Sequence, residues 1–204
     1  MDANKDQTSI LGNAKPSQAI VKLALPATLA LLAKAVYNIV DTAYIGMLGS
    51  DIALTAVGVT VPLLLIMVSI ENIFAAGAAV LAGRQLGAKD EEGASRTVTT
   101  IIGLSIVIGA VLCVGGIVFI EPLMRAFGAS DASLSLAEDY AFWMFVAALA
   151  NLPAQSMNCA ARAESSVKIS SIAVITGALL NVVLDPIFIF PLKMGMAGAA
   201  IATV

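Results

Sequence analysis

Long apolar segments without a charged side chain are the feature that most constrains this chain. Residues 98–120 and 140–161 contain no Asp, Glu, Lys or Arg. A helix of about 20 apolar residues crosses a bilayer, whereas a strand of a membrane barrel alternates apolar and polar residues. The chain is 59% hydrophobic and 12% charged, while soluble domains carry about 25% charged residues. We therefore predict an all-α, polytopic membrane helix bundle and exclude an ordinary soluble enzyme.

The apolar segments predict six transmembrane helices after a polar, cytoplasmic N-terminal tail at residues 1–18. We expect the helices at residues 19–46, 52–83, 98–120, 140–161, 169–190 and 196–204. We expect a loop around Glu121 and Pro122, between the third and fourth helices. The last segment is too short to cross a bilayer, so the sixth helix is expected to be incomplete. Residues 19–204 would then form one six-helix domain, the front part of a longer polypeptide.

Lysine and arginine residues are distributed unequally between the two ends of the predicted helices. Of 11 such residues, eight lie on the side of the N-terminal tail. Arg125 and Lys193 lie on the opposite side, and Lys34 lies inside a span. Because positive residues accumulate on the cytoplasmic side, we expect a multi-pass protein of the cell (inner) membrane with its N-terminus in the cytoplasm.

The composition also excludes several chemistries. The chain has no histidine, its two cysteines are far apart in apolar segments, and it has no glycine-rich phosphate-binding loop. Its net charge of −3 gives no reason to expect a nucleic-acid partner. No nucleophile and base stand at catalytic spacing. We therefore expect no enzyme activity and no bound cofactor, and the lipid bilayer as the surrounding partner.

Ionisable residues inside predicted spans point to function, because burying them in a bilayer is unfavourable. At about 1.5 Å per residue, Asp41, Asp185 and Thr203 lie at roughly 30, 27 and 28 Å above the inner surface. Asn181 precedes Asp185 by four residues and therefore shares its helix face. Two carboxylates, an amide and a hydroxyl offer hard oxygen ligands, which suit Na⁺ or a shared proton. The alternatives are hydrated interfacial aspartates and, for Asn181, a hydrogen bond between helices.

Five further residues are candidates for the surroundings of this site or for a substrate cavity. Tyr37 and Asn38 lie on the same helix face as Asp41. Lys34 either lines a cavity or extends toward the membrane surface, and Glu71 either lines a substrate path or pairs with a neighbour. Met157 offers a pliable apolar wall or simple packing.

Several ordered motifs then resemble a known transporter family. They are VDT at 40–42, IGMLG at 45–49, AVG at 56–58, QLGAKD at 85–90, NVVLDPIFI at 181–189 and GMAGAAIAT at 195–203. Together they resemble the N-terminal lobe of the MATE (multidrug and toxic compound extrusion) transporters, in the prokaryotic DinF-like pattern. The sequence differs from that pattern at Lys34, where an uncharged polar residue is expected.

The resemblance implies one lobe of a two-lobe, twelve-helix transporter whose C-terminal lobe is missing here. Such a protein is a secondary active antiporter that exports organic cations or drugs in exchange for Na⁺ or H⁺. The coupling ion, Na⁺ or H⁺, would be bound in place of any cofactor. The family's ion site matches Asp41, Asn181, Asp185 and Thr203, which would hold Na⁺ or a proton. Two alternatives remain: a flippase of lipid-linked precursors, favoured by Lys34, and a membrane scaffold subunit without transport.

Overall fold

The structure is a computed structural model that describes residues 16–47, 51–164, 166–189, 191, 198, 201 and 202. Nearly all of these residues are helical, and none lies in a strand, which confirms the all-α prediction. The expected sixth helix falls largely outside the described residues. The helices are α2 (Pro16–Gly46), α3 (Asp51–Gly87), α4 (Glu91–Val118), α5 (Ile120–Ala126), α6 (Leu134–Ala163) and α7 (Val167–Ile189).

The segment expected to be a loop after the third span contains the short helix α5. Its Arg125 donates hydrogen bonds of 3.0 Å to Glu121 and 2.9 Å to Asp131. The interaction with Asp131, followed by that with Glu121, raises the pKa of the Arg125 guanidinium. Pro122 is tolerated because a proline in the first turn removes no intrahelical hydrogen bond. The loop prediction was therefore wrong for residues 121–126.

Four of the described helices are long and apolar enough to cross a membrane. They are Ala24–Tyr44 within α2, Asp51–Gly87, Glu91–Val118 and Val167–Ile189. The 30-residue helix α6 is the most polar of the long helices, with Asn151, Gln155 and Asn158 inside its apolar segment. Because α6 packs against α3 and α4, these amides belong to a helix that is largely surrounded by protein.

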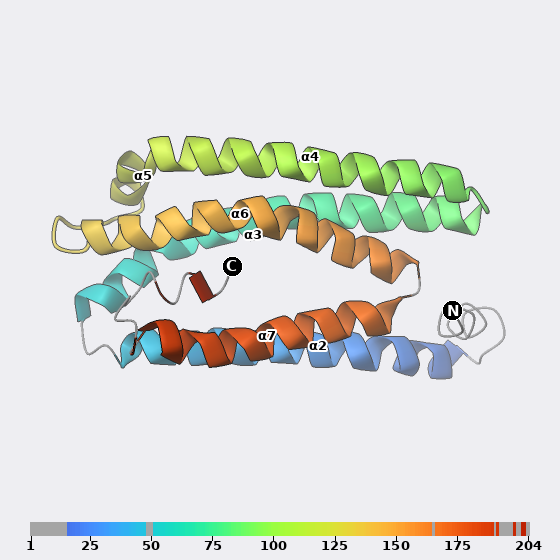
Figure 1. Cartoon of the computed structure of the whole chain (residues 1–204), viewed down its shortest axis with the longest axis horizontal. Helices are drawn as coiled ribbons and strands as arrows, with labels where there is room; N and C mark the ends of the chain where they lie inside the picture. The colour runs from blue at the N-terminus through green and yellow to red at the C-terminus, as the bar shows by residue number, and fades with distance from the viewer. Residues whose placement is uncertain are drawn as a thin grey trace.

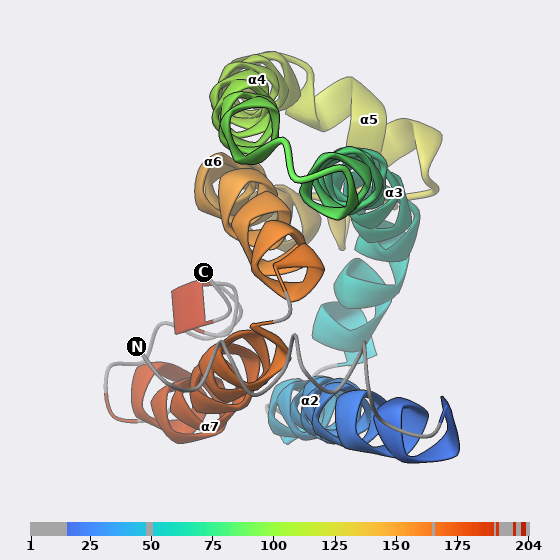
Figure 2. The ribbon, with the colours of Figure 1, turned by 90° about the vertical axis from the view of Figure 1, so that its right-hand side faces the viewer.

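The helices form two groups that lie side by side (Figures 1 and 2). Helices α3, α4 and α6 pack on one another along their lengths, and α5 caps one end of α6. Helices α2 and α7 form a separate close pair. Contacts between the two groups are sparse and run from α6 to α7 and from α2 to α3. The view along the helices in Figure 2 shows the α2–α7 pair on one side of the three-helix group.

Small side chains allow the three-helix group to pack closely. Alanines dominate its buried positions, as expected where helices associate in lipid. Ser105 of α4 and Ser156 of α6 are fully buried, and their hydroxyl oxygens lie 3.0 Å apart. A Cβ atom added at Gly109 would lie 3.0 Å from the backbone oxygen of Ala148. The four-residue spacing of Ser105 and Gly109 therefore marks the α4–α6 contact.

Large apolar side chains cover the outside of the bundle. Leu31, Ile73 and Val114 are 65%, 69% and 65% exposed, respectively. In water such exposure would be unfavourable, whereas lipid tails are as apolar as the side chains themselves. Exposed aliphatic residues of this kind are therefore suited to contact with lipid.

The close approach at Gly109 gives a test of the α4–α6 contact. Replacing Gly109 by Val should lower the free energy of unfolding by about 1–3 kcal/mol, because the new side chain meets the backbone of α6. Gly103→Val is the matched control, since a Cβ at Gly103 meets no atom within 4 Å. Thermal unfolding in detergent, followed by the fluorescence of Trp143, measures both variants. Equal loss of stability in the two variants would contradict the packing.

Candidate functional site

Three of the predicted site residues converge between α2 and α7. Asp41 lies near the end of α2, and Asn181 and Asp185 lie on successive turns of α7. Their exposed fractions are 8%, 5% and 0%. The amide nitrogen of Asn181 donates a 3.2 Å hydrogen bond to Oδ1 of Asp185. The carboxylate of Asp41 is close enough to that of Asp185 to interact with it electrostatically.

The two carboxylates are not satisfied by the residues around them. Within the described part of the chain, Oδ1 of Asp41 and Oδ2 of Asp185 are buried and accept no hydrogen bond. A buried carboxylate is stable only when it is protonated, paired or bound to a cation. Hard oxygen donors at this spacing suit Na⁺ or a proton. The arrangement can therefore take up positive charge.

Two tyrosines extend the cluster toward the three-helix group. Tyr37 lies one turn before Asp41 on α2 and interacts electrostatically with both aspartates. Tyr140 of α6 interacts with the same two aspartates and with Tyr37, and it packs on Ile189 of α7. The sequence analysis did not select Tyr140. Its position at the outer start of a predicted span was the available signal in the sequence.

A cavity of about 350 Å³ is lined by residues of α2 and α7. Lys34 and Tyr37 of α2 line it together with Asn181 of α7. Its other walls are mostly apolar residues of α7, with Ala202 closing one side. Tyr37 and Asn181 therefore belong both to the cavity wall and to the carboxylate cluster. A molecule in this cavity would contact Tyr37 and Asn181, which in turn interact with the aspartates.

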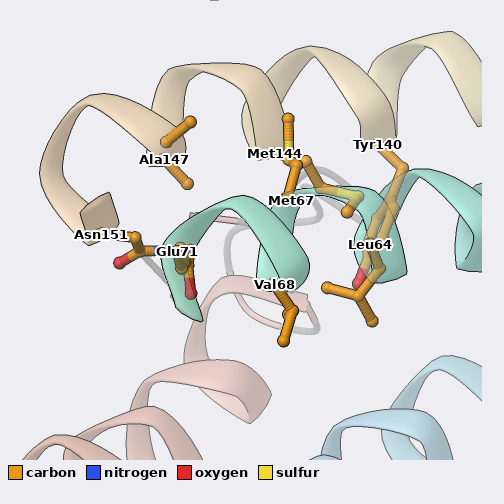
Figure 3. Close-up of a pocket in the computed structure, with 9 residues that line it drawn as sticks. Leu64, Met67, Val68, Glu71, Tyr140, Met144, Ala147 and Asn151 are labelled. Atoms are coloured by element: carbon orange, nitrogen blue, oxygen red, sulfur yellow. The ribbon is translucent and has the colours of Figure 1, made fainter. Parts of the chain in front are cut away.

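A second, smaller cavity of about 80 Å³ lies between α3 and α6 (Figure 3). Glu71 and Asn151 contribute its polar atoms, and Met67, Met144 and Tyr140 are among its apolar and aromatic walls. Figure 3 shows Glu71 on the part of α3 that is turned toward α2 and α7. Glu71 is half-buried and interacts electrostatically with Lys34 of α2. Lys34 of α2 therefore contributes a positive charge to the electrostatic surroundings of Glu71 on the other helix group.

The remaining predicted residues lie elsewhere. Thr203 and the side chain of Asn38 fall outside the described residues. Met157 of α6 is 55% exposed and lines neither of the two cavities described above. No cluster of three or more His, Cys, Asp or Glu side chains exists in the described ranges, so any cation here depends on two carboxylates and neutral oxygens.

Comparison with known proteins identifies the family. The model of the MatE family matches residues 26–187, most of the chain. The chain belongs to the MatE family. The match covers α3, α4, α5 and α6 and includes Asp41, Asn181 and Asp185. It confirms the family resemblance of the sequence motifs.

Curated MatE-family relatives of this chain are named as transporters. The multidrug export protein MepA of Staphylococcus aureus (strain MRSA252) is 28% identical over 186 residues, which are 91% of this chain and 41% of that protein. The FAD transporter of Shewanella oneidensis is 29% identical over 203 residues, which are 98% of this chain and 44% of the relative. The chain therefore spans about two fifths of the length of the relatives it matches.

Solved structures of MatE-type transporters share the fold. An outward-facing multidrug resistance MATE transporter is 30% identical, with a TM-score of 0.87 over 92% of this chain and 42% of that one. A transporter from Pyrococcus furiosus, described as having a binding pocket of reversed polarity that suggests a different function, matches equally well: 30% identity, TM-score 0.87, 92% of this chain and 41% of that one. The arrangement of α2 to α7 is therefore that of a transporter lobe.

The hydrogen bond from Asn181 gives a test of the cluster. Replacing Asn181 by Leu should lower the free energy of unfolding by about 1–3 kcal/mol, because Asp185 loses its donor while it stays buried. Asn151→Leu is the control, since Asn151 is only half-buried and lines the smaller cavity. Thermal unfolding in detergent measures the variants. In an Asp185→Leu background, Asn181→Leu should lower the free energy of unfolding by much less. An equal loss of stability in that background would contradict the hydrogen bond between Asn181 and Asp185.

Proposed function

We propose that this chain is the N-terminal lobe of a secondary active multidrug efflux transporter. The transporter exports drugs or organic cations in exchange for Na⁺ or H⁺. One observation carries the proposal: Asp41 and Asp185 are buried together, and each has a carboxylate oxygen that accepts no hydrogen bond within the described ranges. The family membership and the multidrug export relatives support the same function.

The chemistry of the carboxylate pair supplies the coupling. Two ionised carboxylates in a low-dielectric site repel each other, and binding Na⁺ or a proton removes that repulsion. Asp41 belongs to α2 and Asp185 to α7, so the bound charge draws these two helices together. A state in which the pair is neutralised then differs in free energy from one in which it is ionised. That difference can bias the transporter between outward-open and inward-open forms.

The setting of this lobe follows from the same proposal. A second lobe, in the C-terminal part of a longer chain, would close the substrate cavity and provide the partner surface for alternating access. The chain spans about 41% of MepA, which leaves room in such a relative for a second lobe. The unequal distribution of Lys and Arg supports a cytoplasmic N-terminus in the cell membrane.

A flippase of lipid-linked precursors is the second candidate, because Lys34 lines the larger cavity and suits an anionic group. Its electrostatic interaction with Glu71 offsets that charge, and no other Lys or Arg lines the two cavities described. The observed cluster of three buried polar side chains, Asp41, Asn181 and Asp185, does not support the scaffold alternative. We therefore place drug export first.

Replacing Asp41 by Asn in the intact transporter tests the ion site. Export of a fluorescent drug from vesicles should fall at least tenfold with protein level unchanged, because a neutral amide cannot exchange a proton or attract Na⁺. Asp139→Asn is the matched control, since Asp139 is exposed at the start of the apolar part of α6. Full export by the Asp41 variant would overturn the assignment.

Ion-dependent stability separates the two coupling ions. If Na⁺ binds the pair, millimolar Na⁺ at fixed pH and ionic strength should raise the unfolding temperature of the wild type, because only the folded site binds it. K⁺ in place of Na⁺ is the control for ionic strength, and the Asp41→Asn variant should lose the shift. A response to lowered pH alone, with no Na⁺ shift, would assign the proton instead. No ion-specific response of either kind would contradict the site.

A further inference from the structure

We propose that the hydrogen bond from Ser170 of α7 to Asn158 of α6 is a pivot on which the α2–α7 pair turns against the three-helix group. This pivot rests on the proposed function, because charge uptake at Asp41 and Asp185 drives the turn. Ser170 and Asn158 are then positioning residues that lie far from the ion site along the bundle. The two ends of the bundle differ in the contacts that join the helix groups, and this difference places the pivot (Figure 1).

The end of the bundle at which α6 is followed by α7, called the turn end, joins the helix groups through polar side chains. Ser170 and Ser171 of α7 are 4% and 5% exposed. The Ser170 hydroxyl donates a hydrogen bond to the amide oxygen of Asn158, whose side chain is half-buried on α6. The backbone oxygen of Asn158 also accepts a hydrogen bond of 3.4 Å from Nε of Arg162. A directional contact between buried groups therefore links the two helix groups at the turn end.

Asn158 belongs to a part of α6 that the three-helix group holds in place. Ser156, two residues earlier, is fully buried, and its hydroxyl oxygen lies 3.0 Å from that of Ser105 in α4. At the end of α6, the Cβ atom of Ala163 lies 4.0 Å from where a Cβ atom of Gly83 in α3 would be. Contacts with both α3 and α4 therefore fix the part of α6 that carries the acceptor for Ser170.

The opposite end, called the ion-site end because it carries Asp41 and Asp185, joins the helix groups by apolar and aromatic contact. There Ile189 of α7 packs with Tyr140 of α6 and Val57 of α3. Separating apolar surfaces within a bilayer costs little, because lipid tails replace the lost contacts. Breaking a buried hydrogen bond costs more, because it leaves a donor and an acceptor without partners. The ion-site end is therefore the end that opens, while the turn end stays closed.

The length of α7 between the two ends gives the turn its reach. Asp185 follows Ser170 by 15 residues, so the two lie about 22 Å apart along the helix axis. A rotation of about 10° at Ser170 then moves Asp185 by about 4 Å. Contacts between the helix groups are sparse, so few of them oppose such a rotation. Because α2 and α3 follow each other in the chain at the ion-site end, their connection keeps the movement small.

Distances between pairs of spin labels in the intact transporter test the pivot. With the two native cysteines replaced by alanine, one pair of labels on Met157→Cys and Ile172→Cys spans the helix groups at the turn end. A second pair on Asp139→Cys and Ile187→Cys spans them at the ion-site end, and all four native side chains are exposed. Lowering the pH, or replacing K⁺ by Na⁺, should shift the ion-site pair by about 4 Å and leave the turn-end pair unchanged.

Variants of two adjacent serines on α7 give the matched comparison. Ser170→Ala removes the hydrogen bond to Asn158, so the distance distribution of the turn-end pair should broaden and begin to respond to pH or Na⁺. Drug export should then fall about 2- to 10-fold, the factor that corresponds to one net hydrogen bond. Ser170→Thr keeps a hydroxyl and should restore both the narrow distribution and export. Ser171→Ala is the control, since Ser171 is as buried as Ser170 but is not the donor to Asn158.

The outcomes distinguish the pivot from the export proposal. A turn-end distance that shifts as far as the ion-site distance overturns the pivot, even if the transporter exports drugs. Distances that stay unchanged at both ends under every condition overturn it as well. A shift confined to the ion-site end, in a protein that exports no drug, supports the pivot and contradicts export. If the Ser170→Ala protein does not fold, the distances in the protein with both serines intact still decide between these outcomes.

Discussion

The burial of two carboxylates between α2 and α7 is the constraint on which the rest of the lobe depends. Asp41 and Asp185 lie in helices that a bilayer surrounds, where an uncompensated charge is strongly unfavourable. Asn181 supplies one hydrogen bond to Asp185, while Oδ1 of Asp41 and Oδ2 of Asp185 accept none from the described residues. Under the proposed function, the α2–α7 pair is stabilised when it binds positive charge in addition to its own side chains.

The separation of the helices into two groups gives that charge a means of acting on the fold. The α3–α4–α6 group is held by alanine, glycine and serine contacts, which allow close packing. The α2–α7 pair touches this group mainly near Tyr140 and near the turn after α6, where Ser170 donates a hydrogen bond to Asn158. In the proposed mechanism, a change of charge in the pair shifts it as a unit, because few contacts between the groups have to break.

Most of the fold could be predicted from the sequence because membrane helices are specified by local composition. Unbroken apolar segments gave the positions of the long helices, and the rise per residue placed Asp41 and Asp185 at similar depth. Helix α5 was missed because it is a short, exposed helix that Arg125 holds through Glu121 and Asp131. Hydropathy contains no signal for a helix stabilised in this way.

The sequence by itself determined where the long helices lie and that Asn181 and Asp185 share a helix face, while the depths calculated for the polar residues stay predictions. Only the tertiary structure decided which helices are neighbours. The pairing of α2 with α7, the approach of Tyr140 and the interaction of Lys34 with Glu71 all join residues far apart in the chain. In lipid, the outer and inner faces of a helix are both apolar, so hydropathy does not show which face meets another helix. Small residues mark close packing, but the identity of the partner helix is fixed by three-dimensional packing.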